Sequence, residues 1–347
     1  MPKIAVIGTT SWGTTLAYIL AGKKLKVSLW ARTPAEAAEV LRHPENVVST
    51  HIKFPSNLTV TASAKEAALN ADAVLFAVPS QSIRQNVKLF ADLLKPSMII
   101  INAAKGLEIG SHKRMSEVIA EEIDPKLHSH ICVLSGPNLA REIIKGLPAS
   151  AVVAAADATI AKQAQELLNT PTFCVYTNTD VIGVELGGAL KNVIALGAGM
   201  VDGLEYGDNA KAAFITRGLT EMAALGVAMG ANPLTLSGLT GLGDLIATCA
   251  STLSRNHYVG FELTQGRTLG EITRSMTGVA EGVTTTAAVW DLAQQLKLGM
   301  PITEKLYEVL YRDRDPGEVI AEILGAGGQH ELSGRKWKLF SFVRQRR

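Results

Sequence analysis

The sequence has few of the features that mark several common classes of protein. Its three cysteines, Cys132, Cys174 and Cys249, are far apart and form no CxxC pair, so neither a disulfide framework nor a zinc finger is indicated. The seven histidines include no HExxH motif, and no metal site is predicted. The 34 Lys and Arg nearly balance the 32 Asp and Glu, which removes the electrostatic case for a dedicated nucleic-acid-binding protein.

Long hydrophobic runs are also missing. No stretch of about 18 apolar residues is free of polar interruption, so a membrane span is not expected. The apolar run that starts near Ile4 meets Gly8 and has no cleavage-site pattern, and we therefore expect a cytoplasmic protein. The 347 residues are 47% hydrophobic and 19% charged, which is enough for a sizeable core. At roughly 100–200 residues per domain, this length predicts two domains.

The first half of the chain alternates short β-type runs with helical stretches. Strands are expected at residues 3–8, 25–30, 73–78, 98–102, 131–134, 151–155 and 173–176, and helices at about 11–21, 83–94, 113–122 and 158–168. Continuously apolar strands separated by helices are typical of a parallel sheet that is covered on both faces. The fold class predicted here is therefore α/β, with a Rossmann-like, doubly wound, mostly parallel sheet.

The pattern changes near residue 178. From there to about residue 325 the sequence favours Ala-, Leu- and Gly-rich helices broken by Gly/Pro turns. We predict a dinucleotide-binding domain over residues 1–178, an all-helical C-terminal domain over 179–328 and a basic amphipathic tail over 329–347. Residues 333–347 hold six Lys or Arg and no acid, so the tail either rests on an anionic lipid or partner surface or is a frayed terminus.

The strongest local signal is the turn GTTSWG between the first expected strand and helix. A glycine turn that feeds a helix N-terminus presents backbone N–H groups to a pyrophosphate, so Gly8 and Gly13 are predicted to bind a dinucleotide. Thr10 replaces the middle glycine of GxGxxG, which leaves the pyrophosphate pose open; a plain strand–helix turn is the alternative. After the second strand comes Arg32 instead of Asp or Glu, which favours the 2′-phosphate of NADPH, although a solvated loop arginine is also possible.

Residues 181–204 form the most informative segment. They are nearly apolar, with Lys191 and Asn192 in the middle, and Gly187 and Gly188 one turn earlier are expected to leave space beside the lysine. An ammonium group on apolar surface loses hydration, which lowers its pKa toward neutrality and suits it to general acid/base work. The alternative is a lysine whose stem packs while its charged end reaches water.

Two later segments supply groups that suit a charged substrate. Asp244 and Thr248 lie four residues apart on an expected helix and share a face; a carboxylate on an apolar helix needs a cation, for which Lys191 is a candidate. The run Ser254-Arg255-Asn256 combines a hydroxyl, a guanidinium and an amide, which suits a phosphate dianion. A helix-start aspartate, and a capping serine followed by a surface arginine, are the structural alternatives.

Other candidates follow strands at the edge where open α/β sheets bind ligands. Lys105 comes after the strand that ends at Asn102, and residues 135–138 follow the next strand. Such a lysine can meet a phosphate or a substrate oxygen, while a surface lysine and a plain turn are the alternatives. Glu281 could accept a hydrogen bond from a cofactor, but without further context a turn glutamate is the simpler interpretation.

Taken together, these segments resemble the bacterial-type NAD(P)-dependent glycerol-3-phosphate dehydrogenases. The matching stretches keep the family's order and spacing over about residues 3–325; they are residues 6–17, 103–108, 134–143, 184–204, 239–249, 254–260 and 279–283. The resemblance implies the interconversion of dihydroxyacetone phosphate and sn-glycerol 3-phosphate, feeding glycerophospholipid synthesis, with NADPH favoured and NADH possible. A homodimer is expected.

The resemblance also implies roles for individual residues. Lys191 would be the general acid/base, with Asn192, Asp244 and Thr248 around it. Cofactor contacts are implied for Ser11, Trp12, Arg32, Lys105, Ala140, Arg255, Val279 and Glu281. Substrate contacts are implied for Lys105, Gly136, Asn138, Lys191, Asp244, Ser254, Arg255 and Asn256. Asn138 departs from the family, which usually has Ser or Thr there.

Two other functions stay open on this evidence. One is a different two-domain oxidoreductase that acts on a hydroxy acid or a sugar acid. The other is a cofactor-binding sensor without turnover, which the altered glycine turn at Thr10 suggests.

Overall fold

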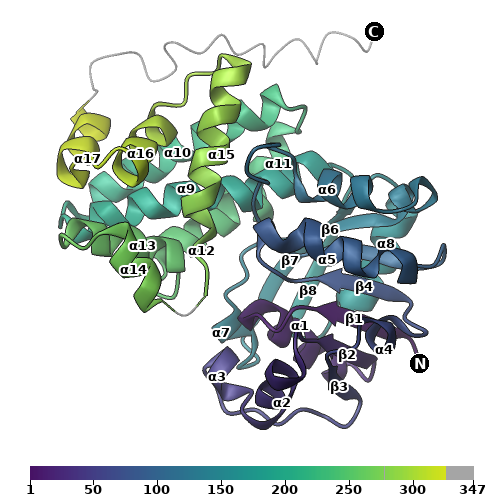
Figure 1. Cartoon of the computed structure of the whole chain (residues 1–347). Helices are drawn as coiled ribbons and strands as arrows, with labels where there is room; N and C mark the ends of the chain where they lie inside the picture. The colour runs from purple at the N-terminus through teal and green to yellow at the C-terminus, as the bar shows by residue number, and fades with distance from the viewer. Residues whose placement is uncertain (277, 326–347) are drawn as a thin grey trace, which may run out of the picture.

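The structure, a computed structural model, describes residues 1–276 and 278–325. Figure 1 shows a body built on a sheet, which holds the N-terminal half, and a body of helices beside it. The strands are β1 (Lys3–Ile7), β2 (Lys26–Trp30), β3 (Leu58–Thr61), β4 (Ala73–Phe76), β5 (Ile99–Asn102), β6 (Ile131–Ser135), β7 (Ala149–Ala155) and β8 (Phe173–Asn178). They form one sheet in the order β3-β2-β1-β4-β5-β6-β7-β8, and every pairing is parallel except β6 with β7. The predicted Rossmann-like, mostly parallel sheet is confirmed.

Helices cover both faces of this sheet. They are α1 (Ser11–Gly22), α2 (Pro34–Arg42), α3 (Glu45–Val48), α4 (Ala64–Ala68), α5 (Ile83–Phe90), α6 (Met115–Glu122), α7 (Ala140–Ile143) and α8 (Ala158–Leu168), with 3₁₀ turns η1 (Ser80–Ser82), η2 (Ala91–Leu93) and η3 (Pro125–His130). The helix expected at 83–94 is thus α-helical only to Phe90, and the one expected at 113–122 begins at Met115. The prediction lacks β3, α2 to α4 and α7. β3 is a half-exposed edge strand of four residues, α3, α4 and α7 have four or five residues each, and the longer α2 buries only Ala37 and Val40.

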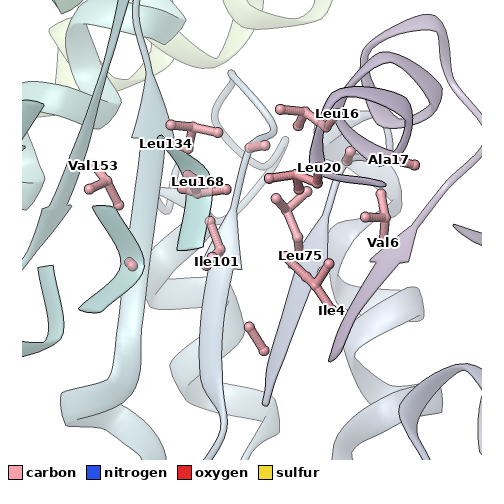
Figure 2. Packing of buried hydrophobic residues seen from close by; sticks show 14 of the residues in the cluster. Ile4, Val6, Leu16, Ala17, Leu20, Leu75, Ile101, Leu134, Val153 and Leu168 are labelled. Carbon is pink, nitrogen blue, oxygen red and sulfur yellow. The ribbon is translucent and has the colours of Figure 1, made fainter. Parts of the chain in front are cut away.

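The core explains why the central strands are continuously apolar. Alternate residues of a strand point to opposite faces of the sheet. In β1, Ile4 and Val6 pack with α1 and α8 on one face, while Ala5 and Ile7 pack with α4, α5 and α6 on the other. Figure 2 shows the first of these layers, where Leu16, Ala17 and Leu20 of α1 lie over the strand residues Ile4, Val6 and Leu75. Both faces are buried, so the strand has no polar face.

The second half is helical throughout residues 179–276 and 278–325, and no strand occurs there. Its elements are α9 (Val181–Gly203), α10 (Gly207–Ala228), α11 (Pro233–Leu236), the π-turn η4 (Leu239–Gly243), α12 (Asp244–Ala250), α13 (Arg255–Thr264), α14 (Leu269–Ser275), α15 (Glu281–Leu296), α16 (Pro301–Tyr311) and α17 (Pro316–Gly325). The predicted helical region is confirmed. The expected tail, residues 329–347, lies outside the described residues.

Helix α9 is the centre of the helical body, and α10, α12, α13 and α15 pack around it (Figure 1). Every residue from 183 to 201 is buried. By length and composition α9 could cross a membrane, but 83% of that stretch is buried inside the protein, as expected for a core helix. At Gly260 a Cβ would stand 1.8 Å from the Leu196 carbonyl oxygen, so only glycine lets α13 approach α9 this closely.

Candidate active site

A cleft of about 680 Å³ lies where the carboxyl ends of the central strands face α9, α12 and α13. The cleft brings together most of the residues singled out in the sequence. Those that line it are Ser11, Trp12, Lys105, Asn138, Ala140, Lys191, Asn192, Asp244, Thr248, Ser254, Arg255, Asn256, Val279 and Glu281. Gly8, Gly13, Arg32 and Gly136 are not among the lining residues.

The turn between β1 and α1 has the geometry that a dinucleotide needs. Gly8 has φ +112°, and a Cβ there would stand 2.7 Å from Val78 Cγ1. A Cβ on Gly13 would stand 2.1 Å from the Gly8 carbonyl oxygen. Both positions therefore require glycine, and the tight turn leaves the first amides of α1 directed outward for an anion. This backbone cradle fits a nucleotide pyrophosphate.

Thr10 has a structural role that the sequence comparison with GxGxxG does not reveal. Its hydroxyl donates to the Ala77 carbonyl oxygen at 2.6 Å and accepts from the Gly13 amide at 3.0 Å. Thr10 is thus the N-cap of α1 and ties the turn to the end of β4.

The centre of the cleft holds two lysines on one buried carboxylate. Asp244 is 1% exposed. Its Oδ2 lies 2.6 Å from Lys105 Nζ, and its Oδ1 lies 3.1 Å from Lys191 Nζ. Lys191 also donates to Thr248 Oγ1 at 2.6 Å, while that hydroxyl lies 2.6 Å from the Asp244 carbonyl oxygen. Lys191 is therefore placed as the cation expected for Asp244, and Lys105 is a second cation on the same carboxylate.

Lys105 joins the two bodies of the protein at this point. Besides Asp244, its ammonium donates to the carbonyl oxygen of Gly136, at the end of β6, at 2.8 Å. Burial lowers the pKa of Lys105 from 10.5 to about 8; the carboxylate of Asp244 opposes this shift, and the charge of Lys191 adds to it. With two ammonium groups facing one carboxylate, the site has an excess of positive charge that suits an anionic substrate or a developing oxyanion.

The glycines before Lys191 act differently from the prediction. A Cβ on Gly187 would stand 2.5 Å from the Thr240 carbonyl oxygen, and a Cβ on Gly188 would stand 2.4 Å from Ser135 Oγ. The expectation that they leave space beside the lysine is wrong. They instead let η4 and the end of β6 pack directly on α9, which brings Asp244 and the sheet edge to Lys191.

The segment 254–256 is held partly by its own hydrogen bonds. Ser254 is the N-cap of α13, because its hydroxyl accepts from the His257 amide at 3.2 Å. Asn256 donates to Asn192 Oδ1 at 2.8 Å and accepts from the Gly282 amide at 2.9 Å. A carboxamide carries two N–H donors, so Asn256 keeps one for a substrate. Its other bonds tie α13 to α9 and α15.

Arg255 and Glu281 both line the cleft. Gly278 has φ +92°, and a Cβ there would stand 2.1 Å from Arg255 Nη1, so glycine admits the guanidinium. Glu281 accepts from the amide and the hydroxyl of Ser80 at 3.0 and 2.5 Å, and burial raises the pKa of its carboxyl. Glu281 therefore connects α15 to the turn after β4. The sequence analysis does not predict a role for Ser80. The signal that could have indicated one is the position of Ser80 shortly after a strand.

The remaining predicted residues lie around the cleft. Asn138 donates to the Ser150 carbonyl oxygen at 3.0 Å, and its buried Oδ1 has no hydrogen-bond partner among the described residues. That orphaned acceptor is free for a ligand. Ala140 is the first residue of α7, and Val279 is exposed at the mouth of the cleft. Arg32 lies further out, with a side chain that is 79% exposed.

The fold and the cleft together define a class. A parallel sheet with a nucleotide-binding turn, facing a helical domain that contributes a buried lysine, is the arrangement of a two-domain nicotinamide-nucleotide-dependent dehydrogenase.

Comparison with known proteins narrows the class to one family. The sequence pattern of the NAD-dependent glycerol-3-phosphate dehydrogenase N-terminus matches residues 3–161, and that of the C-terminus matches residues 180–321. The chain belongs to the NAD-dependent glycerol-3-phosphate dehydrogenase family.

Individual relatives match over nearly their whole length. A glycerol-3-phosphate dehydrogenase (NAD(P)+) of Dehalococcoides mccartyi is 58% identical over 349 aligned positions, which cover 100% of this chain and 97% of the relative. One from Geobacter metallireducens is 48% identical over 93% of this chain and 96% of its own. The crystal structure of glycerol-3-phosphate dehydrogenase from Coxiella burnetii superposes with a TM-score of 0.87 at 36% identity, covering 93% of this chain and 98% of that one.

Proposed function

We propose that this protein interconverts dihydroxyacetone phosphate and sn-glycerol 3-phosphate with a nicotinamide nucleotide. The observation that carries the proposal is the buried cluster of Lys191, Asp244 and Lys105, which faces the nucleotide-binding turn across the cleft. We further propose that residues 1–178 bind the cofactor and residues 179–328 bind the substrate. The product would serve glycerophospholipid synthesis in the cytoplasm.

The proposed chemistry divides between the cofactor and the protein. A bound nicotinamide nucleotide, held at the turn of Gly8 to Gly13, supplies the hydride that reduces the C2 carbonyl carbon. Lys191 donates a proton to the carbonyl oxygen, which becomes the C2 hydroxyl, and it removes that proton in the reverse direction. Asp244 and Thr248 hold the Lys191 ammonium in place. A cation fixed in position before the reaction lowers the barrier by several kcal/mol, on the order of an oxyanion-hole donor.

The substrate phosphate requires a second positive group, away from the reacting carbonyl. Arg255 and the remaining N–H of Asn256 lie at the start of α13, on the same cleft. A guanidinium beside an amide donor suits a phosphate dianion. We assign Ser254 chiefly to capping α13, since its hydroxyl already accepts from the His257 amide.

The cofactor is proposed to be NADPH in preference to NADH. Arg32 lies two residues after the end of β2, and its exposed guanidinium is available to a 2′-phosphate. We also propose that the protein forms a homodimer, which sedimentation velocity would test: a species of about 37 kDa would contradict it, since one chain is 36.8 kDa.

A spectrophotometric assay tests the activity directly. Oxidation of NADPH and of NADH is followed with dihydroxyacetone phosphate, and separately with ketopantoate and 3-oxo acids. Turnover with dihydroxyacetone phosphate alone supports the proposal. Turnover with an oxo acid would favour the other two-domain oxidoreductases, and NADPH binding without any oxidation would favour a sensor.

A further inference from the structure

A carboxylate lies close to the cofactor-binding turn although none directly follows β2 in the sequence. Glu36, in α2, accepts a hydrogen bond from the Thr9 hydroxyl through Oε1. Through Oε2 it accepts from the Arg32 amide at 3.2 Å and from Arg32 Nε at 3.4 Å. Glu36 therefore bridges the glycine turn and the segment after β2.

The local sequence holds this side chain in place. Thr33 is the N-cap of α2, accepting from the Glu36 amide at 3.1 Å, and Pro34 starts the helix. Glu36 is consequently in the first turn, where the helix dipole favours a negative charge. Its side chain is 28% exposed, against 79% for Arg32, so the carboxylate is the more restrained member of the pair.

Glu36 lies in the part of a Rossmann fold that binds the adenosine ribose of a dinucleotide. In such folds an acid near the end of the second strand accepts a hydrogen bond from the ribose 2′-hydroxyl, whereas an arginine accommodates a 2′-phosphate. This chain has both groups, ion-paired to one another. A 2′-phosphate entering here would meet Arg32 favourably and Glu36 unfavourably.

We propose that Glu36 is the residue that sets selectivity between the two nicotinamide nucleotides. It accepts from the ribose 2′-hydroxyl of NADH and opposes the 2′-phosphate of NADPH, so it offsets the preference that Arg32 creates. This inference rests on the proposed function only in requiring a nicotinamide nucleotide in the cleft. It concerns the adenosine end of that nucleotide, which does not react.

The test measures binding instead of turnover. Isothermal titration gives the Kd of ADP-ribose and of 2′-phospho-ADP-ribose, which lack the nicotinamide ring, for the wild type and for Glu36→Gln. We expect the variant to bind the 2′-phosphorylated probe about tenfold more tightly, because a like charge is removed. ADP-ribose should bind about tenfold more weakly, because a charged acceptor is lost. The ratio of the two Kd values would then change about a hundredfold.

A matched control separates selectivity from helix capping. Glu66 holds the same place in α4: its amide donates to the cap Ser63, and its carboxylate accepts from the Thr61 hydroxyl at 2.6 Å. Glu66→Gln should leave the ratio of the two Kd values unchanged. Glu36→Asp, which keeps the charge, should keep most of the discrimination against the 2′-phosphate, and Glu36→Ala, which removes the charge, serves as the second variant should Glu36→Gln unfold.

Two outcomes overturn the inference: an unchanged ratio in Glu36→Gln, whether both Kd values stay the same or change equally, or the same shift of the ratio in Glu66→Gln. The outcome is independent of the proposed reaction, because neither probe can be oxidised or reduced. Failure to turn over dihydroxyacetone phosphate would refute the proposed function while leaving this result intact.

Discussion

Asp244 offers the sharpest test of the site, because one carboxylate neutralises two ammonium groups in a place that water barely reaches. Asp244→Asn keeps the shape of the side chain and removes its charge. The amide then faces Lys105 and Lys191, whose nitrogens lie 2.6 and 3.1 Å from the present oxygens. Both cations lose their compensating partner.

The size of the effect follows from burial. Removing one partner of a buried ion pair costs about 3–5 kcal/mol, because the other charge is left uncompensated. We expect Asp244→Asn to lose about that much unfolding free energy at pH 7. Turnover of dihydroxyacetone phosphate should also fall by at least about a hundredfold, because Lys191 is no longer held.

The loss of stability should depend on pH with a definite sign. In the wild type the pKa of Lys105 is about 8, below its ordinary 10.5, so the unfolded chain binds more protons between these values and stability rises with pH across that window. Asp244 opposes the lowering, so the variant should have a still lower Lys105 pKa. The window then extends below pH 8, and the deficit of the variant should shrink from pH 7 to pH 9.

Urea unfolding at pH 7 and pH 9, followed by circular dichroism, measures this deficit. Asp157→Asn is the control, because Asp157 caps α8 by accepting from the Thr159 amide through Oδ1 at 2.7 Å, a hydrogen bond that the carboxamide oxygen of Asn can also accept. Asn caps helices about as well as Asp, so this variant should change by less than about 1 kcal/mol and without pH dependence. A variant Asp244→Asn that is as stable as the wild type at pH 7, or a deficit that grows with pH, would refute the reasoning.

Three further outcomes are expected. Lys191→Ala should lower kcat by about 10²–10⁴-fold, measured by stopped-flow turnover. The Kd of the cofactor, measured by titration, should change little. Turnover near that of the wild type would remove the role assigned to Lys191. In the wild type, kcat/KM for dihydroxyacetone phosphate should fall above about pH 8 as Lys105 loses its proton. Lys105→Arg should move that fall to higher pH, because arginine stays charged. Identical pH profiles of the wild type and the variant would contradict this prediction. Gly187→Ala should lower the free energy of unfolding in urea by about 1–3 kcal/mol, since its Cβ would stand 2.5 Å from the Thr240 carbonyl oxygen. Gly22→Ala should not lower it, because a Cβ at Gly22 would have no atom within 4 Å.

Much of the fold could be predicted because its signals are local. Continuous apolar runs place seven of the eight strands within two residues of their observed ends, and β3 is missed because a short edge strand is half-exposed and lacks such a run. Helix α8 is predicted at its observed bounds, since its apolar residues repeat at helical spacing. The antiparallel pairing of β6 with β7 carries no local signal, because strand direction depends on the path of the intervening loop.

In the candidate site, too, the local features could be predicted from the sequence and the long-range contacts could not. The residue types and their segments stand out in the sequence: a lysine in an apolar helix, an aspartate among glycines, and an arginine after the second strand. Their partners do not. Glu36 and Ser80 are ordinary polar residues in the sequence, and only the fold places them against Thr9 and Glu281.

The sequence by itself predicted which segments hold the candidate site residues and determined the kind of sheet that supports them, because apolar periodicity and glycine turns act over a few neighbouring residues. Tertiary structure alone decided that Lys105, 139 positions away from Asp244 along the chain, shares its carboxylate. It also decided that Gly187 and Gly188 of α9 admit the Thr240 carbonyl group and the Ser135 hydroxyl instead of leaving a space. Distances between segments far apart in the chain come from the packing of whole layers, which no single stretch of residues encodes.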